Sequence, residues 1–422
     1  MQAASVRKPA TGELPNQWKL FLLDDVAVRG SGHTPDKKHP EYWNGEIKWI
    51  SLRDTDRLDK LYISDTTAKI TPLGIAHSSA VVHPAGTVVL SRDAGVGKSS
   101  IMTCEMAVSQ HFMAWHCGPS LNNVFLYYWL QSRKSEFERI AMGNTIKTIG
   151  LPYFRALRLL LPPIEEQLAI AAALSDVDAL INSLDRLIAK KRDIKQATMQ
   201  QLLTGKTRLP GFKKKDGFKQ TEIGQIPKDW HESPVKDFTV NHKQGYYTKD
   251  RYVQHGIRLV RITDLLNPQI DYESMPMLNI SKVEYEQFRI GKGDFLFARS
   301  GAIGRYGIVA EEVEAVFGSY IIRFALDQTK VMNEYFGFLY ETKIVWKQLL
   351  SITQGSSNIN INASNIKSIK VPLPPIDEQL AIVSVLSSMS AEIKALERRR
   401  DKTILLKQGM MQELLTGRIR LV

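Results

Sequence analysis

The stretch GVGKS, from Gly95 to Ser99, holds residue types that could bind a nucleotide phosphate. A phosphate-binding loop, G-x-x-x-x-G-K-[ST], surrounds phosphate oxygens with backbone N–H groups and a lysine, but it needs glycine where this chain has Arg92. An adenine methyltransferase would carry an N-P-P-[YF] or D-P-P-[YF] motif, whereas Asn267-Pro268 is followed by Gln269. No grouping of carboxylates and lysine is typical of a nuclease. The sequence therefore predicts a chain that is not itself an enzyme.

A second candidate for chemistry is a group of possible zinc ligands, Cys104, His111, His116 and Cys117. Their spacing follows no common zinc-binding pattern, and the corresponding stretch of the second half of the chain, around Tyr320, has neither His nor Cys. We expect a buried strand with incidental polar residues here, and no metal site.

The composition indicates a folded, basic protein of several domains. A length of 422 residues suits two to four domains, and 43% hydrophobic with 24% charged residues excludes wholesale disorder. The formal charge of +12 favours a polyanionic partner, with nucleic acid the first candidate. Only two cysteines occur, which favours the reducing cytoplasm, and neither a signal peptide nor a run of about 18 apolar residues is present. We therefore expect a cytoplasmic protein with no membrane partner.

An internal repeat organises the chain. LPPIEEQLAI at residues 161–170 returns as LPPIDEQLAI at 373–382, and at the same offset 26 of the 49 positions from Leu161 to Leu209 are identical to those from Leu373 to Leu421. Trp18 aligns with Trp230 at this offset too. The chain thus consists of two copies of one unit, each with a variable region followed by a similar segment.

The similar segment predicts a long helix. Pro162, Pro163 and the acidic residues that follow suit a helix start, and no Gly or Pro appears until Gly205, so the helix should run from Ile164 to Leu203, roughly 60 Å. Apolar residues recur at steps of three and four, which predicts pairing of the two helices, although each apolar stripe could instead pack on its own domain. The predicted pairing residues are Leu174, Val177, Ile181, Leu184, Leu386, Met389, Ile393 and Leu396.

The variable regions predict mixed α and β domains. Short β-type runs such as VVLSR and DFLFARS alternate with glycine-rich turns and helical stretches. Between the halves, the segment from Pro84 to Met102 matches the segment from Gly291 to Val309 weakly. We expect a shared topology with diverged surfaces.

The LPP-[IL]-x-EQ helix start, the LLTGK or LLTGR helix end and the TEIGQIPKDW stretch, repeated around two divergent domains, resemble the DNA-specificity subunit of type I restriction-modification systems. The resemblance implies an α+β fold with two target-recognition domains, joined by two long antiparallel helices that form a coiled coil. Pairing of the two helices would relate the halves of this tandem repeat by a pseudo-two-fold, and the segments after the helices, TGKTRL and TGRIRL, begin alike, which predicts a nearly circular organisation. The corresponding boundaries are 1–160, the first target-recognition domain, 161–206, the central helix, 207–372, the second target-recognition domain, and 373–422, the distal helix.

The same resemblance implies what the chain binds. Each domain would read one half of a bipartite, asymmetric site on double-stranded DNA, with the helices as a ruler. Two adenine methyltransferase subunits and ATP-dependent restriction subunits would be the protein partners. S-adenosylmethionine, ATP and magnesium would belong to those partners, and no cofactor to this chain. One departure is the distal helix, where Arg398, Arg399 and Arg400 replace Arg186, Leu187 and Ile188, which interrupts the apolar seam.

The candidate DNA-binding residues lie on three kinds of loop. Two glycine-flanked loops place long cations where backbone could approach a phosphate or a base edge, the stretches GNTIKTIG and GSSNININ offer hydrogen-bonding groups, and KQGYYTKDRY interleaves aromatic residues with cations. Solvated surface charge, turn chemistry and a surface loop remain the respective alternatives. The candidates are Arg92, Lys98, Asn144, Thr145, Lys147, Tyr246, Tyr247, Lys249, Arg251, Arg299, Arg305, Ser357 and Asn358.

A different class of protein, a coiled-coil scaffold that binds nucleic acid without sequence preference, is the alternative function. A specificity subunit must prefer its own site over random duplex by orders of magnitude, whereas a scaffold would show uniformly salt-sensitive binding. A third possibility, a hidden nuclease or methyltransferase, would require turnover by the chain without partners.

Overall fold

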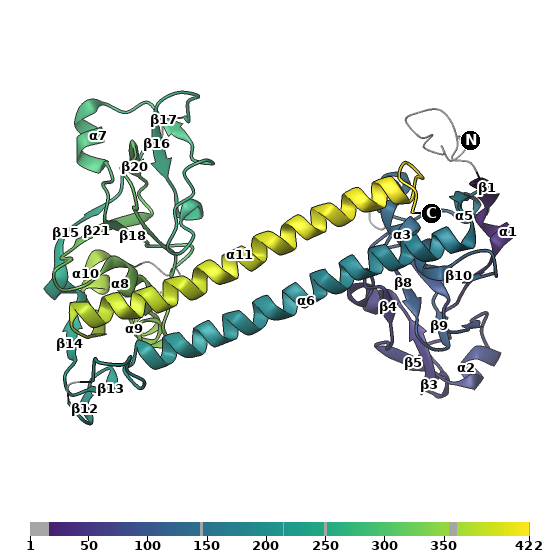
Figure 1. Cartoon of the computed structure of the whole chain (residues 1–422), viewed down its shortest axis with the longest axis horizontal. Coiled ribbons are helices and arrows are strands. Elements are labelled where there is room, and N and C mark those ends of the chain that lie inside the picture. Colours follow the sequence, from purple (N-terminus) through teal and green to yellow (C-terminus); the bar gives the residue numbers. More distant parts are fainter. Residues whose placement is uncertain (1–16, 144–146, 214, 249–250, 354–360, 422) are drawn as a thin grey trace. The chain divides into compact units, whose positions relative to one another are not determined.

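The computed structural model describes residues 17–143, 147–213, 215–248, 251–353 and 361–421 (Figure 1). The chain divides into two compact units, each of which contains one globular domain and part of each long helix. Unit 1 comprises Met1–Arg186 and Glu397–Val422, and unit 2 comprises Leu187–Leu396.

Unit 1 contains a five-stranded sheet at its centre. Its inner strands β7 and β8 are buried at every position, as expected for short apolar runs covered on both faces. The order is β2 (Ala27–Ser31), β10 (Phe112–Cys117), β7 (Val88–Ser91), β8 (Ser99–Met102) and β4 (Tyr62–Ile63). A four-stranded sheet follows the order β5 (Ala68–Ile70), β3 (Trp43–Ile50), β9 (Met106–Val108) and β6 (Val82–His83), and β1 (Lys19–Leu22) pairs with β11 (Arg158–Leu161).

Helix α3 (Asn123–Ser132) packs on the central sheet of unit 1. It begins at Asn122, whose side chain accepts a hydrogen bond from the backbone N–H of Phe125, and it is buried continuously from Phe125 to Leu130. The remaining helices of the domain are short. They are α1 (Leu23–Val26), α2 (Pro72–Ala76), α4 (Lys134–Ile140), α5 (Leu151–Arg155) and the 3-10 turns η1 (Pro40–Tyr42) and η2 (Leu52–Arg57).

Unit 2 repeats this plan. Its main sheet has the order β15 (Thr239–Gln244), β21 (Ile321–Leu326), β18 (Asp294–Ala298) and β19 (Tyr306–Ile308). The second sheet is β17 (Met277–Leu278), β16 (Ile257–Val260) and β20 (Ala315–Phe317), and the two-stranded pairs are β14 (His231–Pro234) with β22 (Lys370–Leu373) and β12 (Phe218–Thr221) with β13 (Gly224–Pro227). The weak match that the sequence gives between the halves therefore reflects a shared strand order.

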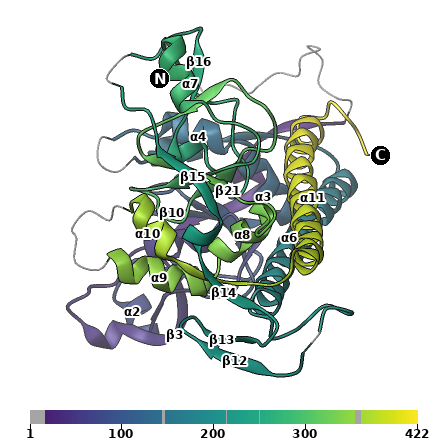
Figure 2. The same ribbon diagram turned by 90° about the vertical axis from the view of Figure 1, so that its left-hand side faces the viewer.

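Short helices gather around helix α9 in unit 2, where α8 and α10 both contact it (Figure 2). Aromatic residues fill the core between α8 and the main sheet, including Phe295, Phe297 and Phe336. The short helices of the whole domain are α7 (Lys282–Phe288), α8 (Asn333–Tyr340), α9 (Lys343–Thr353) and α10 (Ala363–Ser368), with the 3-10 turns η3 (Val235–Phe238) and η4 (Ile262–Asp264).

The two long helices are α6 (Ile164–Leu202) and α11 (Ile376–Leu414), each 39 residues long, or about 58 Å at 1.5 Å per residue. Within unit 1 the ion pair from Lys407 to Asp178 (2.6 Å) and the pair from Arg400 to Asp185 (3.4 Å) join them. The α11 residue with the higher number contacts the α6 residue with the lower number, so the helices are antiparallel. The expected fold class, α+β domains with long antiparallel helices, is confirmed.

Unit 2 shows the same antiparallel pairing. Lys191 of α6 contacts Glu392 of α11 at 2.7 Å, and buried Leu202, at the end of α6, and Leu203, which follows it, share one core with Ile382 and Leu386 of α11. The helices of this unit are thus joined by both charge and apolar contact.

The predicted pairing residues are buried to different degrees. Leu174 and Leu386 are fully buried, and each lies in the core of its own domain together with the end of the other long helix, so both expected roles of the apolar stripe apply there. Leu184 and Ile393 are buried, whereas Val177, Ile181, Met389 and Leu396 are half-buried. Arg400, one of the arginines that interrupt the apolar seam of α11, aligns with the buried Ile188 of α6. Arg400 forms an ion pair with Asp185.

The repeated LPPIxEQ motif attaches each helix start to its domain. The Gln167 amide donates to the carbonyls of Ser120 and Pro162 (both 2.9 Å) and accepts from the N–H of Asn122, all within unit 1. Gln379 repeats this pattern in unit 2 with Lys330, Pro374 and Met332. The motif is therefore a buried connection, which explains why both copies retain it.

The glutamate of the same motif receives an arginine from the end of the other long helix. In unit 2, Arg208, which follows α6, donates to buried Glu378 at 2.6 and 2.7 Å, and Trp230 donates to the same carboxylate at 3.0 Å. In unit 1, Arg420, which follows α11, contacts Glu166 at 2.5 and 2.7 Å. The segment after α11 thus occupies in unit 1 the place that the segment after α6 occupies in unit 2, consistent with the expected circular organisation.

Both long helices contain an 18-residue window that is apolar enough, by length and composition, to cross a membrane. In each case part of the window lies in a domain core, where Ile170 and Leu174 of α6 and Ile382 and Leu386 of α11 are buried. Burial in a domain core accounts for the apolarity of this part of each window.

Candidate nucleic-acid interface

Two of the loops predicted to bind DNA lie together in unit 1. Arg92 directly follows β7, its carbonyl accepts a hydrogen bond from the N–H of Ile149 (3.0 Å), and its N–H donates to the carbonyl of His111 (3.0 Å). Antiparallel bridges link Thr148 to Asp93 and to Met142. Residues 148 and 149 are thereby held against the turn that follows β7.

Unit 2 joins the equivalent segments in the same way. Arg299 directly follows β18, its carbonyl accepts from the N–H of Ile361 (2.7 Å), and its N–H donates to the carbonyl of Tyr320 (2.9 Å). Gly97 and Gly304 both adopt positive φ, at +85° and +95°, which supports the alignment of the two glycine-flanked turns. The two domains therefore make the same backbone contacts to Arg92 and Arg299, from Ile149 and His111 in unit 1 and from Ile361 and Tyr320 in unit 2.

The unit 1 candidates differ in their access to a ligand. The side chain of Arg92 is only 18% exposed, with its Nε 3.7 Å from Asp93, and Lys98 donates to the carbonyl of Thr55 at 3.2 Å. Lys147 is exposed. A cation that already has partners within the domain gives a ligand less new interaction, so Lys147 is the better placed of the three.

The unit 2 candidates are mostly exposed. Tyr247 is 68% exposed, and Arg251 and Arg305 are exposed, while the Nη1 atom of Arg305 lies 3.4 Å from the carbonyl oxygen of Ile262. Tyr246 is half-buried and donates to Glu284 at 3.1 Å. The half-buried Arg299 is the counterpart of Arg92. The predicted residues Asn144, Thr145, Lys249, Ser357 and Asn358 lie outside the described residues.

The sequence did not single out His111 and Tyr320 as DNA-binding residues. The backbone carbonyl of His111 accepts a hydrogen bond from the N–H of Arg92, and that of Tyr320 accepts from the N–H of Arg299. His111 directly precedes β10, which pairs with β7, and Tyr320 directly precedes β21, which pairs with β18. The sequence offered two signals, the alignment of Arg92 with Arg299 and the correspondence of the stretch around Tyr320 with the stretch that contains His111. Strand pairing, which the sequence did not show, places these two residues beside the arginines.

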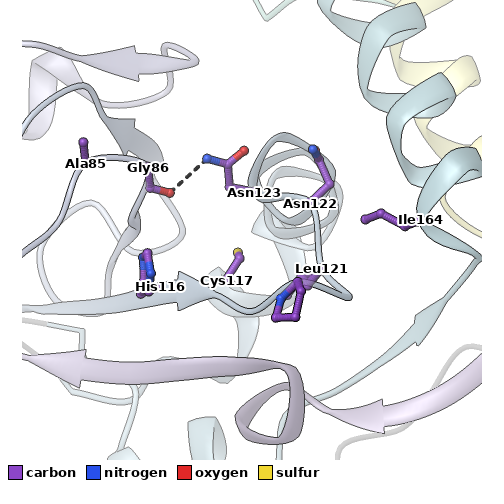
Figure 3. A pocket seen from close by; sticks show the side chains of 9 residues that line it. Ala85, Gly86, His116, Cys117, Leu121, Asn122, Asn123 and Ile164 are labelled. Atoms are coloured by element: carbon purple, nitrogen blue, oxygen red, sulfur yellow. Dashed lines mark hydrogen bonds between the residues drawn. The ribbon is translucent and has the colours of Figure 1, made fainter.

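The four possible zinc ligands do not share one position. His111 Nδ1 lies 2.6 Å from Asp93, whereas His116 and Cys117 line a pocket of about 300 Å³ at the far end of β10 (Figure 3). Burial raises the pKa of the Cys117 thiol to about 12, which disfavours the thiolate that binds a metal. Among the residues the structure describes, no group of three or more His, Cys, Asp or Glu is arranged to hold a metal ion.

The pocket beside β10 is bounded by the start of α3. Asn123 donates from Nδ2 to the carbonyl of Gly86 at 3.0 Å, which ties the helix to the loop before β7 (Figure 3). In unit 2, Asn333 makes the same bond to the carbonyl of Gly293 at 2.7 Å. This repeated contact belongs to the domain scaffold.

The repeat is also visible in a comparison with protein families. The family described as type I restriction modification DNA specificity domain matches the chain twice, over residues 15–192 and 227–406. The chain belongs to this family. Each match covers one domain and a large part of the long helix that follows it, so the family unit coincides with the duplicated unit of the fold.

Relatives within the family resemble most or nearly all of the chain. The type I restriction enzyme MjaVIII specificity subunit of Methanocaldococcus jannaschii is 26% identical and covers 96% of this chain and 94% of its own length. The EcoBI specificity subunit of Escherichia coli is 24% identical over 71% of this chain and 65% of its own length.

Solved structures of the family share the fold. The S subunit of a type I restriction-modification system from M. genitalium has a TM-score of 0.57 at 16% identity, covering 95% of this chain and 97% of that one. A chain from a study of complex assembly in a type I system has a TM-score of 0.59 at 15% identity, covering 96% of this chain and all of that one.

Proposed function

We propose that this chain is the sequence-reading subunit of a type I restriction-modification complex, and that it is non-catalytic itself. Each domain reads one half of a bipartite, asymmetric site on double-stranded DNA, and the long helices set the separation of the halves. The observation that carries the proposal is the equivalence of the loops after β7 and β18, which keep their backbone contacts while their side chains differ. A shared frame with different side chains suits the reading of two unlike half-sites.

The basic character of the chain supports DNA as the ligand. The formal charge is +12, and exposed Lys147, Arg251 and Arg305 lie on or beside the loops described above. Contacts of lysine and arginine with phosphates supply affinity, whereas contacts with base edges supply specificity.

An exposed stripe on each long helix supports two copies of one protein partner. On α6 the residues Leu168, Ala179, Arg186 and Lys190 are exposed and lie near one helix face, since their separations approximate whole turns. The α11 residues at the equivalent positions are identical and also exposed, namely Leu380, Ala391, Arg398 and Lys402. Packing within the chain does not require these identities, so we assign each stripe to one adenine methyltransferase subunit.

The catalytic chemistry would then lie in the partners. S-adenosylmethionine belongs to the methyltransferase subunits, and ATP and magnesium to the restriction subunits. The proposed complex acts on DNA in the cytoplasm.

The adenine methylome of the host, read by single-molecule sequencing with the gene intact and then deleted, tests the proposal. Loss of one gapped, two-part methylation motif on deletion is the expected result. An unchanged methylome, with the neighbouring methyltransferase expressed, would favour the scaffold function. Turnover by the purified chain with S-adenosylmethionine, ATP and magnesium, but without partners, would contradict a non-catalytic role.

The proposed partner surface has its own test. Leu168→Glu and Leu380→Glu place a charge on side chains that are 51% and 56% exposed, so the fold should tolerate them. Each variant should lose one of two bound methyltransferase subunits in native mass spectrometry. The matched control is Leu405→Glu, because Leu405 is 66% exposed on the same helix as Leu380 but aligns with Asp193. Equal loss in the control would contradict the assignment.

A further inference from the structure

His111 and Tyr320 occupy the same place in the two domains. Besides the contact with the arginine after the central strand, each sits at the end of a tight turn: Phe112 N–H donates to the carbonyl of Ser109 (3.2 Å), and Ile321 N–H donates to the carbonyl of Gly318 (2.9 Å). Backbone atoms alone make these contacts. The side chains at the two positions are therefore not dictated by the turn.

The His111 ring is held in a defined orientation. Its Nδ1 lies 2.6 Å from Oδ2 of Asp93, a side chain that is 12% exposed. The other carboxylate oxygen of Asp93 accepts from the hydroxyl of Thr148. A carboxylate that accepts Nδ1–H leaves Nε2 available for a hydrogen bond, and the His111 side chain is 31% exposed.

Tyr320 offers a different group at the equivalent position. It is 63% exposed, although a tyrosine at the start of a buried strand could pack its ring inward. Ser300 takes the place of Asp93 in this domain, so the residue at that position offers a hydroxyl group instead of a carboxylate. A tyrosine presents a ring face and a hydroxyl group, whereas a supported imidazole presents one nitrogen.

Because His111 and Tyr320 occupy equivalent positions with different side chains, we propose that they contact base edges of the DNA and give the two half-sites different sequences. Asp93 is the positioning residue that holds His111. The inference rests on the proposed function and deepens it, because it names residues that determine specificity.

A purely structural role for the Asp93–His111 pair predicts a different outcome. A structural clamp would change stability, or affinity at every position of the first half-site alike. A base contact changes the preference at one or two base positions, because only the bases that it touches lose discrimination.

The experiment selects bound duplexes with the full-length chain from libraries randomised in one half-site at a time. His111→Ala should reduce preference at one or two positions of the first half-site by roughly five- to tenfold, and leave the second unchanged. Tyr320→Ala should do the converse. Asp93→Asn can still accept from His111 through its single amide oxygen, while its NH2 group can donate to the Thr148 hydroxyl, so it should retain the wild-type preference, whereas Asp93→Ala should resemble His111→Ala.

The matched control is His116→Ala, because His116 is an exposed histidine at the opposite end of the strand that His111 precedes. It should leave both profiles unchanged. Unaltered profiles for His111→Ala and Tyr320→Ala, or uniform weakening at all positions, would overturn the inference. Failure of the wild-type chain to select any two-part site would instead overturn the proposed function, so the two failures are distinguishable.

Discussion

Replacement of Arg208 by methionine should destabilise unit 2 more than the equivalent replacement of Arg420 destabilises unit 1. The Arg208 side chain is 8% exposed and contacts both Glu378, at 1% exposed, and Asp229. Burial alone would lower the pKa of Arg208, but hydrogen bonds and charges from the two carboxylates outweigh it and raise the pKa. The arginine is thus firmly charged within a nearly buried network.

The expected cost follows from what the substitution leaves behind. Arg208→Met keeps an apolar stem but removes the two hydrogen bonds that Arg208 donates to the buried Glu378 carboxylate, which then keeps its hydrogen bond from Trp230. Removal of one partner of a buried ion pair costs about 3–5 kcal/mol. Arg420 is 27% exposed, so water can replace part of its contact with Glu166. Arg420→Met should therefore cost about 1.5–3 kcal/mol, the range for hydrogen bonds to charged groups.

Urea unfolding measures the total loss, and native-state hydrogen exchange assigns it to a unit. The protection of backbone amides against hydrogen exchange should fall in the core around Trp230 for Arg208→Met and in the core around Trp18 for Arg420→Met. The double variant Arg208→Met with Glu378→Gln should lose less than the sum of the single losses, because the unpaired charge is gone. Equal losses in the two units, or an additive double variant, would refute the reasoning.

Three further outcomes are expected. Gly304→Ala should cost about 1–3 kcal/mol by thermal unfolding, because φ is +95° and a Cβ atom would lie 2.3 Å from the Trp346 ring. Burial raises the pKa of Glu341 above its usual 4.5, so the folded state binds this proton more tightly than the unfolded state does. The free energy of unfolding should therefore fall as the pH rises from about 4.5 through the folded-state pKa. Glu341→Gln should remove that fall, which urea midpoints measured against pH would show. Asn333→Ala should lose about 1–3 kcal/mol, since it removes a buried side chain that donates at 2.7 Å to the half-buried carbonyl of Gly293, and a loss below about 0.5 kcal/mol in urea would contradict that role.

Much of the architecture was readable from the sequence. The repeat at a constant offset gave two equivalent units, and the unbroken stretch after Pro163 predicted a helix from Ile164 to Leu203, one residue longer than the observed α6. These features are local or periodic, so neighbouring residues suffice to determine them. The runs VVLSR and DFLFARS likewise contain the central strands β7 and β18.

The candidate interface was less accessible to sequence reasoning. Arg92 and Lys98 have the residue types expected of a DNA contact, yet the fold gives them partners in Asp93 and Thr55. In the sequence, His111 stands out only as a possible zinc ligand. Its partner Asp93 lies 18 residues away, and strand pairing brings the two together.

The sequence alone therefore determined the duplication, the long helices and the family resemblance, because these reside in residue identity and spacing. The tertiary structure decided which cations are buried, which side chain stands beside each arginine, and how Arg208 and Arg420 meet glutamates 170 and 254 residues away. The physical reason is that burial and ion pairing depend on contacts between segments far apart in the chain, and strand order and helix packing select those contacts.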